Sequence, residues 1–292
     1  FEMQRDFPDT RFDCMRYFLG DVRDKDRLYR AFDGVDIVVH AAALKQVPAA
    51  EYNPIEAIRT NVLGAANVID AAIDKGVQRV VALSTDKAAN PINLYGATKL
   101  CSDKLFIAAR AYSNARTRFC VVRYGNVIGS RGSVVPVFLR QKDGGSVTIT
   151  DERMTRFVIT LDQGVQFVID SLERMQGGEI FVPKIPSVAI NDIAEAIAPG
   201  CTRNYIGIRP GEKLHEVMVA EDDARNTLEF ANYFSILPDA GALENPLFTQ
   251  NGLAKRCPED FRYSSDRNDV WVNAAGFDRL WQDEQDSEAR SL

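Results

Sequence analysis

The hydrophobic positions of this chain change their period repeatedly from one end to the other. Short runs of apolar, β-branched residues alternate with longer segments in which apolar residues recur at helical spacing. Such alternation is typical of an α/β fold in which crossover helices connect parallel strands. The predicted strands span residues 14–19, 35–42, 80–84, 118–123, 147–150 and 179–182. The predicted helices span residues 24–32, 55–75, 95–112, 134–142, 162–175 and 190–198.

The same pattern indicates how the chain divides. Most predicted strands are continuous apolar runs, so we expect helices on both faces of a Rossmann-like parallel sheet. After about residue 180 the strands shorten, and Pro, Gly and charged residues become denser. We therefore predict a Rossmann-like domain over 1–178, a smaller lobe mainly over 179–282 with some interleaving, and a disordered acidic tail over 283–292. Gly76 and Gly200 follow predicted helices, where a C-cap favours a residue that adopts positive φ.

Composition places the chain among globular proteins. Of its 292 residues, 46% are hydrophobic and 26% are charged. The 35 basic and 41 acidic side chains give a net charge of −6, and no block of Lys or Arg could follow a phosphate backbone, which argues against nucleic acid as a partner. The sequence has no apolar run long enough for a membrane span and no recognisable signal peptide. We expect a cytoplasmic protein without membrane contact.

Cysteine and histidine usage excludes a structural zinc cluster. The five cysteines are widely separated without a CxxC pair, and the chain has only two histidines. This usage favours small buried thiols over a disulfide framework. His40 lies inside an apolar strand and is interpreted as a core residue. His215 is predicted to open a helix, with a capping or surface role.

In an open α/β sheet, ligands bind beyond the carboxyl ends of the strands, so the residues that follow each strand are the candidates for chemistry. Ala41, Ala42 and Ala43 follow the second predicted strand, and Lys45 comes two residues later. Small side chains there let a pyrophosphate-bearing ligand approach the backbone. Tight packing beside a solvated lysine explains the same residues equally well.

Two pairs of polar residues suggest acid–base chemistry. Tyr95 and Lys99 are four residues apart on a predicted helix and so share one face, where an ammonium favours the phenolate. This spacing is a weak signal alone and gains weight because it follows a polar strand end. Asp86 and Lys87 form that strand end and are either a surface ion pair or an acid and a desolvated base, which together perform an elimination.

These residues resemble the extended short-chain dehydrogenases/reductases that act on nucleotide sugars and, more narrowly, the inverting UDP-N-acetylglucosamine 4,6-dehydratases of the pseudaminic acid pathway. The resemblance covers nearly the whole chain. Its longest strings are STDKAANPINLYGATK over 84–99, RYGNVIGSRGSVVP over 123–136, TDERMTRF over 150–157 and IGIRPGEKLHE over 206–216. Shorter ones are GDVRD over 20–24 and AAALK over 41–45, which VP follows at 47–48.

The resemblance implies a mechanism in which hydride leaves C4 of the sugar for the cofactor and later returns to C6. Tyr95, assisted by Lys99, takes the proton of the 4-hydroxyl, and Thr85 hydrogen-bonds the same oxygen. Lys87 removes the C5 proton, and Asp86 protonates the departing 6-hydroxyl. Retaining relatives carry Asp-Glu where this chain has Asp86 and Lys87, so the lysine is associated with inversion at C5. The implied enzyme is a carbon–oxygen lyase.

The resemblance also implies NADP as cofactor, with NAD as the lesser candidate, and a UDP-sugar as substrate. The implied cofactor contacts are Asp21, Val22, Ala41, Ala42, Ala43, Lys45, Asn61, Tyr95, Lys99, Tyr124, Gly125 and Asn126. The implied substrate contacts are Lys45, Thr85, Tyr95, Asn126, Arg131, Arg209 and Glu212, the last three being ordinary loop charges on the alternative view. No metal is expected.

The sequence departs from the family in two places. Gln46 stands where relatives have His, which leaves the implied chemistry intact. The glycine-rich turn G-x-G-x-x-G of a Rossmann domain does not occur, and because the chain begins with Phe1 we expect that turn upstream. Two alternatives stay open, namely a sibling UDP-sugar epimerase or capsule-pathway dehydratase, and a non-catalytic Rossmann binding module. A homo-oligomer is expected from the resemblance.

Overall fold

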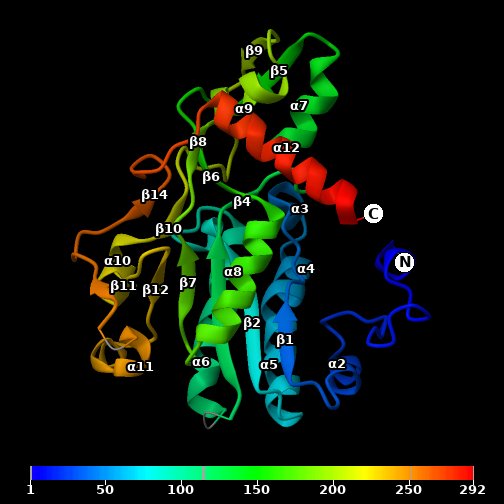
Figure 1. The fold of residues 1–292 in the computed structure, drawn as a ribbon, viewed down its shortest axis with the longest axis vertical. Helices are drawn as coiled ribbons and strands as arrows, with labels where there is room; N and C mark the ends of the chain where they lie inside the picture. Colours follow the sequence, from blue (N-terminus) through cyan, green and yellow to red (C-terminus); the bar gives the residue numbers. More distant parts are fainter. Residues whose placement is uncertain (1, 114–115, 251, 292) are drawn as a thin grey trace.

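The computed structural model describes residues 2–113, 116–250 and 252–291, which form a large mixed sheet with a smaller lobe at one end (Figure 1). Within these residues the large sheet has seven strands in the order β1-β2-β3-β7-β12-β11-β13. Its parallel strands are β1 (Ile37–His40), β2 (Arg79–Thr85), β3 (Arg118–Tyr124) and β7 (Ile180–Pro183). Its antiparallel strands are β12 (Tyr233–Ile236), β11 (Thr227–Glu229) and β13 (Lys255–Arg256).

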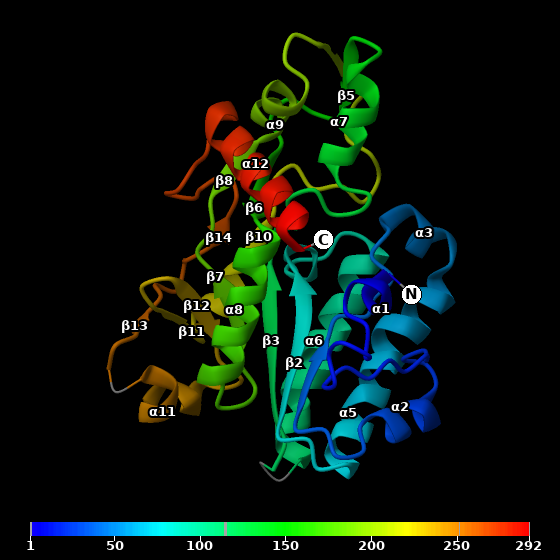
Figure 2. The ribbon, with the colours of Figure 1, turned by 45° about the vertical axis from the view of Figure 1, so that its right-hand side comes forward.

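Helices cover both faces of the parallel strands β2 and β3, as the continuous apolar runs predict (Figure 2). The helices α5 (Gly64–Asp74) and α6 (Leu94–Tyr112) lie on one face, and α8 (Leu161–Arg174) lies on the other. Alternate residues of β2 point to opposite faces. Val80 and Ala82 share an apolar cluster with Phe106 of α6, whereas Val81 packs in a second cluster beside Leu172 of α8.

A smaller lobe lies beyond the carboxyl ends of the parallel strands (Figure 1). Its core is a separate apolar cluster that includes Phe138, Ile149, Ile193 and Phe277. The strands on this side are β4 (Asn126–Val127), β5 (Ser146–Ile149), β6 (Thr155–Ile159), β8 (Ser187–Ala189), β9 (Thr202–Tyr205), β10 (Val217–Val219) and β14 (Tyr263–Ser264). The helices are α7 (Val134–Lys142), α9 (Ile190–Ile197) and α12 (Ala274–Ser291).

Short helices fill the connections. Those before β2 are α1 (Glu2–Asp6), α2 (Lys25–Ala31), α3 (Val47–Tyr52), α4 (Pro54–Ile58) and the π-helical turn η1 (Arg59–Leu63). Those after β2 are the 3₁₀ turns η2 (Asp86–Ala88) and η3 (Ala240–Glu244), with α10 (Glu221–Ala224) and α11 (Pro246–Thr249). The predicted helix over 55–75 is therefore interrupted by one π turn. Gly76 and Gly200 have φ of 72° and 74°, so the predicted positive-φ positions are confirmed.

The predicted domain boundary at residue 178 does not divide the structure cleanly. The strands β7, β11, β12 and β13 come after this residue and extend the large sheet. The helix α7 and strand β5 come before it and pack in the smaller lobe, where β5 pairs with β9. The two regions are interleaved because the chain crosses between them several times.

The predicted strand over 14–19 is wrong. These residues have no regular secondary structure, and Leu19 is 90% exposed. A strand exists only when a neighbour accepts its backbone hydrogen bonds, and within the described residues no such neighbour pairs with this segment. The side chains of Ile37 and Val39 on β1 are correspondingly exposed.

The predictions for the acidic tail and for His215 are also wrong. Residues 283–291 continue α12, and the buried Glu284 carboxylate accepts a hydrogen bond of 2.8 Å from the backbone N–H of Leu161. This contact stabilises the end of a helix whose own sequence is strongly polar. His215 lies in a bend before β10 and opens no helix.

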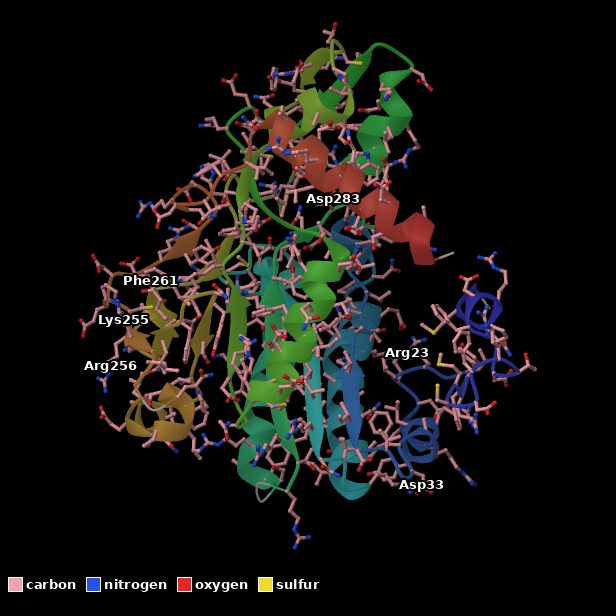
Figure 3. All side chains as sticks on the ribbon, in the orientation of Figure 1. Arg23, Asp33, Lys255, Arg256, Phe261 and Asp283 are labelled. Carbon is pink, nitrogen blue, oxygen red and sulfur yellow. The ribbon has the colours of Figure 1, made fainter. Side chains whose placement is uncertain are left out.

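Charged side chains distribute over both flanks of the sheet (Figure 3). Arg23 and Asp33 lie beside α2 on one flank, and Lys255, Arg256 and Phe261 lie on the opposite flank. Within the described residues, no helix combines the length and apolar character that a bilayer span requires.

Candidate active site

The polar end of β2 and the turn that follows it form the centre of the site. Thr85 is the N-cap of η2, and its hydroxyl oxygen accepts a hydrogen bond from the backbone N–H of Lys87 at 3.3 Å. The same hydroxyl donates to Asp86 Oδ1 at 2.9 Å. The parallel register pairs Thr85 with Tyr124 of β3, so the two predicted polar strand ends meet at one edge of the sheet.

Asp86 and Lys87 form a buried charge cluster with Glu216, which lies just before β10. Asp86 is 0% exposed, and Lys87 Nζ lies 3.0 Å from Asp86 Oδ1 and 3.3 Å from Glu216 Oε1. Burial raises the pKa of Asp86, the Glu216 carboxylate raises it further, and Lys87 opposes both effects. Asp86 Oδ2 has no hydrogen-bond partner in the structure. Asp86 is therefore poised to hold a proton.

Lys87 differs from the prediction that desolvation lowers its pKa. Burial does act in that direction, but the nearby carboxylates of Asp86 and Glu216 outweigh it and raise the pKa of Lys87 above its usual range. The amine is therefore an ammonium in this state. It becomes a base only when a proton moves within the cluster or when substrate changes the charges around it.

Tyr95 and Lys99 lie on the first turns of α6, whose N-terminus is fixed by Asn93. The Asn93 side chain caps the helix by accepting from the backbone N–H of Gly96 at 2.8 Å. A Cβ atom on Gly96 would lie 2.2 Å from the carbonyl oxygen of Lys87, so only glycine allows this close approach. The helix therefore brings Tyr95 against the η2 turn.

The predicted proton acceptor is a neutral phenol in this structure. Burial raises the pKa of Tyr95 to about 12, and the Lys87 cation and a hydrogen bond to Thr85 act in the opposite direction. The prediction assigned that electrostatic effect to Lys99. Lys99 is buried instead, its ammonium donates to the carbonyl of Leu83 at 2.8 Å, and burial lowers its pKa.

Two turns from the smaller lobe are placed over this centre by glycines. A Cβ on Gly132 would lie 2.7 Å from the Gln46 amide, which brings the loop of Arg131 against the loop of Lys45. The carbonyl of Gly211 accepts a hydrogen bond from Asn93 Nδ2 at 2.7 Å, and its φ is 79°. This contact places Arg209 and Glu212 beside the start of α6, where the two side chains lie 3.9 Å apart on the surface.

Of the predicted cofactor contacts, the small residues Ala41, Ala42 and Ala43 are exposed at the end of β1. Asn61 is buried, and its amide accepts from the N–H of Leu44 at 2.8 Å and donates to the carbonyl of Leu44 at 3.0 Å. Its observed contacts therefore position the loop that carries Lys45.

Tyr124, Gly125 and Asn126 are half-buried at the end of β3, near Thr85. A Cβ on Gly125 would lie 2.5 Å from Cβ of Phe157, so this glycine lets β6 pack closely. Asp21 lies further away and is paired with Arg23 at 2.7 Å, an ion pair that lowers the pKa of Asp21 to about 2.

The residues present fit one half of a nicotinamide dinucleotide. A buried Tyr and Lys, a run of exposed alanines and the Tyr-Gly-Asn turn surround the carboxyl ends of β1, β2 and β3. The sequence contains no G-x-G-x-x-G turn of the kind that cradles a pyrophosphate. These residues would therefore suit the nicotinamide half of such a cofactor.

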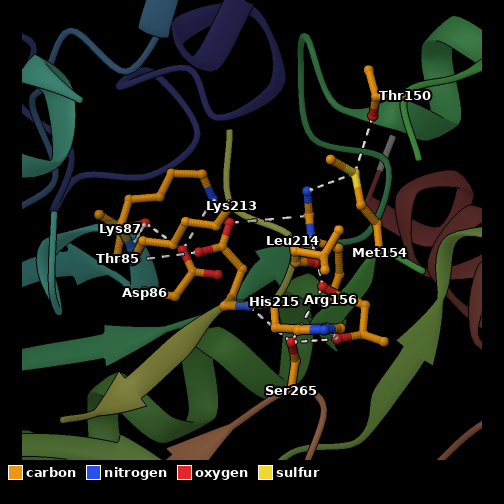
Figure 4. A network of polar contacts seen from close by, with 12 residues as sticks. Thr85, Asp86, Lys87, Thr150, Met154, Arg156, Lys213, Leu214, His215 and Ser265 are labelled. Carbon is orange, nitrogen blue, oxygen red and sulfur yellow. Dashed lines mark hydrogen bonds and ion pairs between the residues drawn. The ribbon is translucent and has the colours of Figure 1, made fainter. Parts of the chain in front are cut away.

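Sequence reasoning missed three charged residues of the cluster, although each lies in a quoted string. Glu216 has Arg156 Nε at 4.0 Å and Lys213 Nζ at 3.8 Å. Lys213 also donates to the carbonyl of Ala89 at 2.6 Å, next to the η2 turn. Figure 4 shows Thr85, Asp86 and Lys87 in one polar network with Arg156, Lys213, His215 and Ser265. Lys213 and Glu216 are three residues apart, but Arg156 and the Asp86–Lys87 pair lie more than fifty residues away in sequence, so spacing gives no signal that the three segments meet.

A second buried ion pair anchors α6 to the sheet. Arg123 Nη2 of β3 lies 3.3 Å from Asp103 Oδ2 of α6, and the same carboxylate oxygen accepts from the Ser84 hydroxyl at 2.8 Å. Arg123 Nη1 donates to the carbonyl of Met218 at 3.0 Å. The pair ties together β2, β3, α6 and β10, the elements that carry or flank the site.

A Tyr-x-x-x-Lys pair on a helix beside the carboxyl ends of parallel strands defines the short-chain dehydrogenase/reductase class of α/β proteins. The chain belongs to the polysaccharide biosynthesis protein family, whose model matches residues 1–238. It is 56% identical over 267 residues to a UDP-N-acetylglucosamine 4,6-dehydratase (inverting) of Campylobacter jejuni subsp. jejuni serotype O:2, an alignment that covers 89% of this chain and 80% of that protein.

Other similarities extend beyond dehydratases. The chain is 44% identical over 247 residues to a UDP-glucose 4-epimerase of Rickettsia akari, covering 82% of this chain and 72% of the relative. Among solved structures, Pen from Bacillus thuringiensis superposes with a TM-score of 0.84 at 37% identity, covering 97% of this chain and 85% of that one. The predicted family and the Rossmann-like fold are therefore confirmed.

Proposed function

We propose that this protein is a nucleotide-sugar 4,6-dehydratase that converts UDP-GlcNAc to UDP-2-acetamido-2,6-dideoxy-β-L-arabino-hex-4-ulose. The observation that carries this proposal is the buried Asp86–Lys87 pair beside Tyr95 and Lys99. An acid and an amine next to an oxidation site are what the removal of water from a 4-keto sugar requires. The 56% identity to an inverting dehydratase supports the same assignment.

A nicotinamide dinucleotide, when bound, supplies a hydride acceptor for C4 and a hydride donor for C6. We assign NADP, with Ala41, Ala42 and Ala43 along its path and Tyr124, Gly125 and Asn126 beside its nicotinamide half. Asp21 and Val22 are assigned to the adenine side. The family resemblance supports NADP over NAD, and the site residues support the nicotinamide in general.

The first step assigned to the chain is removal of the proton from the sugar 4-hydroxyl by Tyr95. Thr85 lies within hydrogen-bonding range of Asp86 and is placed to orient the same oxygen. Because burial holds the pKa of Tyr95 at about 12, the phenol must lose its own proton when substrate and cofactor change the charges around it. Lys87 is the cation whose field favours that loss.

The second step is elimination of water across C5 and C6. The C5 proton passes to the Lys87 amine, the C6–oxygen bond breaks, and the Asp86 carboxylic acid gives its proton to the departing hydroxyl, which leaves as water. The cofactor would supply the hydride for C6. A proton from solvent would reach C5 on the opposite face, balanced by the proton that Tyr95 gives up to solvent. The burial of Asp86, which raises its pKa, supports its role as the acid.

The loops at the rim are assigned to the UDP moiety. Arg131 and Arg209 carry guanidinium groups that fit diphosphate oxygens with paired donors. Glu212 is assigned to a hydroxyl or N–H of the uridine, and Lys45 and Asn126 to the sugar side. The contacts of Gly132 with Gln46 and of Gly211 with Asn93 support this arrangement, because they bring one loop against the segment after β1 and the other against the start of α6.

The test is incubation of the protein and NADP with UDP-GlcNAc in deuterated water, followed by NMR of the sugar. We expect loss of the 6-hydroxyl, a new 6-methyl group and deuterium at C5. Recovery of unchanged sugar would contradict catalysis and favour a binding module. Formation of the 4-epimer without loss of water would favour an epimerase, the activity named for the Rickettsia relative.

We propose a cytoplasmic homo-oligomer whose product enters pseudaminic acid synthesis. Mass measurement in solution tests the oligomer. The fate of the product is tested by supplying it to an extract of the source cell and following the sugar.

A further inference from the structure

Glu216 is placed where it controls the geometry of Lys87. Its side chain is 3% exposed, and Oε1 lies 3.3 Å from Lys87 Nζ. The backbone of Glu216 is fixed as well, since its N–H donates to the Ser265 hydroxyl at 2.9 Å and its carbonyl accepts from the N–H of Ser265 at 2.8 Å. Because these hydrogen bonds fix its backbone, Glu216 offers its carboxylate to Lys87 at one position only.

Charged and titratable groups from four parts of the fold face this amine. Two carboxylates contact it directly, and cations and a phenol form the next layer. These groups are Asp86 of η2, Glu216 before β10, Arg156 of β6, Lys213 of the preceding turn and Tyr95 of α6. The cations Lys87, Arg156 and Lys213 together lower the pKa of Glu216 despite its burial, so this residue remains an anion.

We propose that Glu216 is a positioning residue for the dehydration step, holding the Lys87 nitrogen beside Asp86 and stabilising the ammonium that forms when the C5 proton is removed. This inference rests on the proposed function for its chemical consequence. The resting cluster contains an ammonium between two carboxyl groups 3.0 and 3.3 Å away. That arrangement is the one expected immediately after Lys87 has taken a proton and Asp86 has given one up.

Charge balance explains why the second carboxylate is useful. Before elimination, a neutral Lys87 and a protonated Asp86 carry no net charge, and Glu216 carries −1. Afterwards, an ammonium and a carboxylate again sum to zero, so the cluster's total charge does not change. Transfer of one proton along the 3.0 Å Lys87–Asp86 contact then restores the starting state. The negative charge of Glu216 stabilises the ammonium form of Lys87 before and after this transfer, because an opposite charge within about 4–6 Å favours the ionised form.

The first test reads the cluster without any turnover. The side-chain carboxyl of Asp86 is followed by carbon-13 NMR against pH in the wild type, in Glu216→Gln and in Glu216→Asp. Removing the negative charge should lower the titration midpoint of Asp86 by about 1 to 3 pH units. Glu216→Asp keeps the charge and should leave the midpoint near the wild-type value. Glu229→Gln, which removes an equal charge at a partly buried ion pair with Lys184, is the matched control and should leave the Asp86 midpoint unchanged.

The second test reads the reaction. In Glu216→Gln, deuterium incorporation at C5 should fall about 100-fold because the base is no longer held in place, whereas KM for UDP-GlcNAc should stay within about twofold. The acidic limb of the pH–rate profile, which reports protonation of the base Lys87, should move to lower pH because the charge that stabilises the ammonium is gone. Glu216→Asp should recover most of the rate, which a purely steric role of the longer side chain would not allow.

The results separate this inference from the proposed function. An unchanged Asp86 midpoint in folded Glu216→Gln protein, or equal losses in the Gln and Asp variants, would overturn the role of Glu216. The Asp86 midpoint could fall in Glu216→Gln even though the wild type leaves UDP-GlcNAc unchanged. That result would support Glu216 as the positioning residue for Lys87 and would reject the proposed dehydratase function. Should Glu216→Gln fail to fold, the Glu216→Asp titration and rate decide alone, and a displaced midpoint with wild-type exchange would contradict the proposal.

Discussion

The buried cluster at the end of β2 and the exposed rim above it use the same kinds of charged residues in opposite ways. Asp86 and Glu216 are buried, the Lys87 side chain between them is 27% exposed, and the ammonium lies within 3.3 Å of both carboxylates. Arg209 and Glu212 are 3.9 Å apart, and the arginine side chain is 59% exposed. Water screens the rim pair, so that pair contributes little to stability and is free to exchange its partner for a ligand.

The difference shows which region is preorganised. Removing one member of a buried group leaves a desolvated charge unpaired, which costs far more than the loss of a surface contact. The cluster is therefore suited to fix proton positions, and the rim is suited to capture a charged substrate. Substitutions in the two regions should consequently differ in both size and kind.

The largest effect is expected for Lys87→Ala. Loss of the amine removes the proposed base, so deuterium incorporation at C5 should fall by about 10²- to 10⁴-fold while the KM for UDP-GlcNAc changes little. NMR in deuterated water measures the exchange. Lys184→Ala, at a half-buried lysine that pairs with Glu229 away from the site, is the control and should retain full exchange. Undiminished turnover in Lys87→Ala would remove this residue from the reaction.

The next largest effect is expected on the free energy of unfolding at acidic pH, through the buried His40. Burial lowers the pKa of this histidine to about 4, and its ring packs 5.6 Å from that of Phe106. The folded state therefore disfavours the proton that the unfolded state binds below about pH 6.5. Stability should decline by about 3 kcal/mol as the pH falls from 6.5 to 4. Thermal unfolding against pH measures it.

The control for His40 is His40→Phe, which removes the titrating group and keeps a ring. Its free energy of unfolding should depend less on pH between 6.5 and 4 than that of the wild type. Parallel curves for the two proteins would show that other groups cause the acid sensitivity.

At the rim, Arg209→Ala should raise KM for UDP-GlcNAc about 10- to 100-fold, the value of a lost charge-assisted hydrogen bond, with kcat nearly unchanged. Steady-state kinetics at two salt concentrations measure this, since screening should weaken the wild type more than the variant. A loss confined to kcat would mean that Arg209 acts in the chemical step, as the buried cluster does, and would contradict the division between rim and cluster.

The smallest effect is expected at Arg23, which pairs with Asp21 at 2.7 Å on the exposed flank. Although this pair lowers the pKa of Asp21 to about 2, both side chains are largely in water. Arg23→Ala should therefore leave the melting temperature unchanged within error. A clear loss of stability would mean that exposed pairs matter here as buried ones do.

The elements predicted best are those with a strong local pattern. The predicted helix over 134–142 agrees with α7 at both ends, and the strand over 118–123 differs from β3 by one residue. Apolar period and capping act within a few residues, so they can be read locally. The segment over 14–19 is also apolar, but no strand in the described part of the chain pairs with it. The polar end of α12 is helical, and Glu284 and Ser287 in it form hydrogen bonds with Leu161 and Asp162. Both outcomes depend on distant residues.

The sequence by itself determined the α/β alternation, the Tyr95–Lys99 face of α6 and the Asp86–Lys87 strand end, because each is a local arrangement of neighbouring residues. Only the tertiary structure decided that Glu216, more than a hundred residues later, closes the cluster around Lys87. It also decided the proton positions. Burial alone would favour a neutral lysine, and two carboxylates brought together by the fold reverse that preference. Spacing along a chain carries no record of such long-range electrostatics.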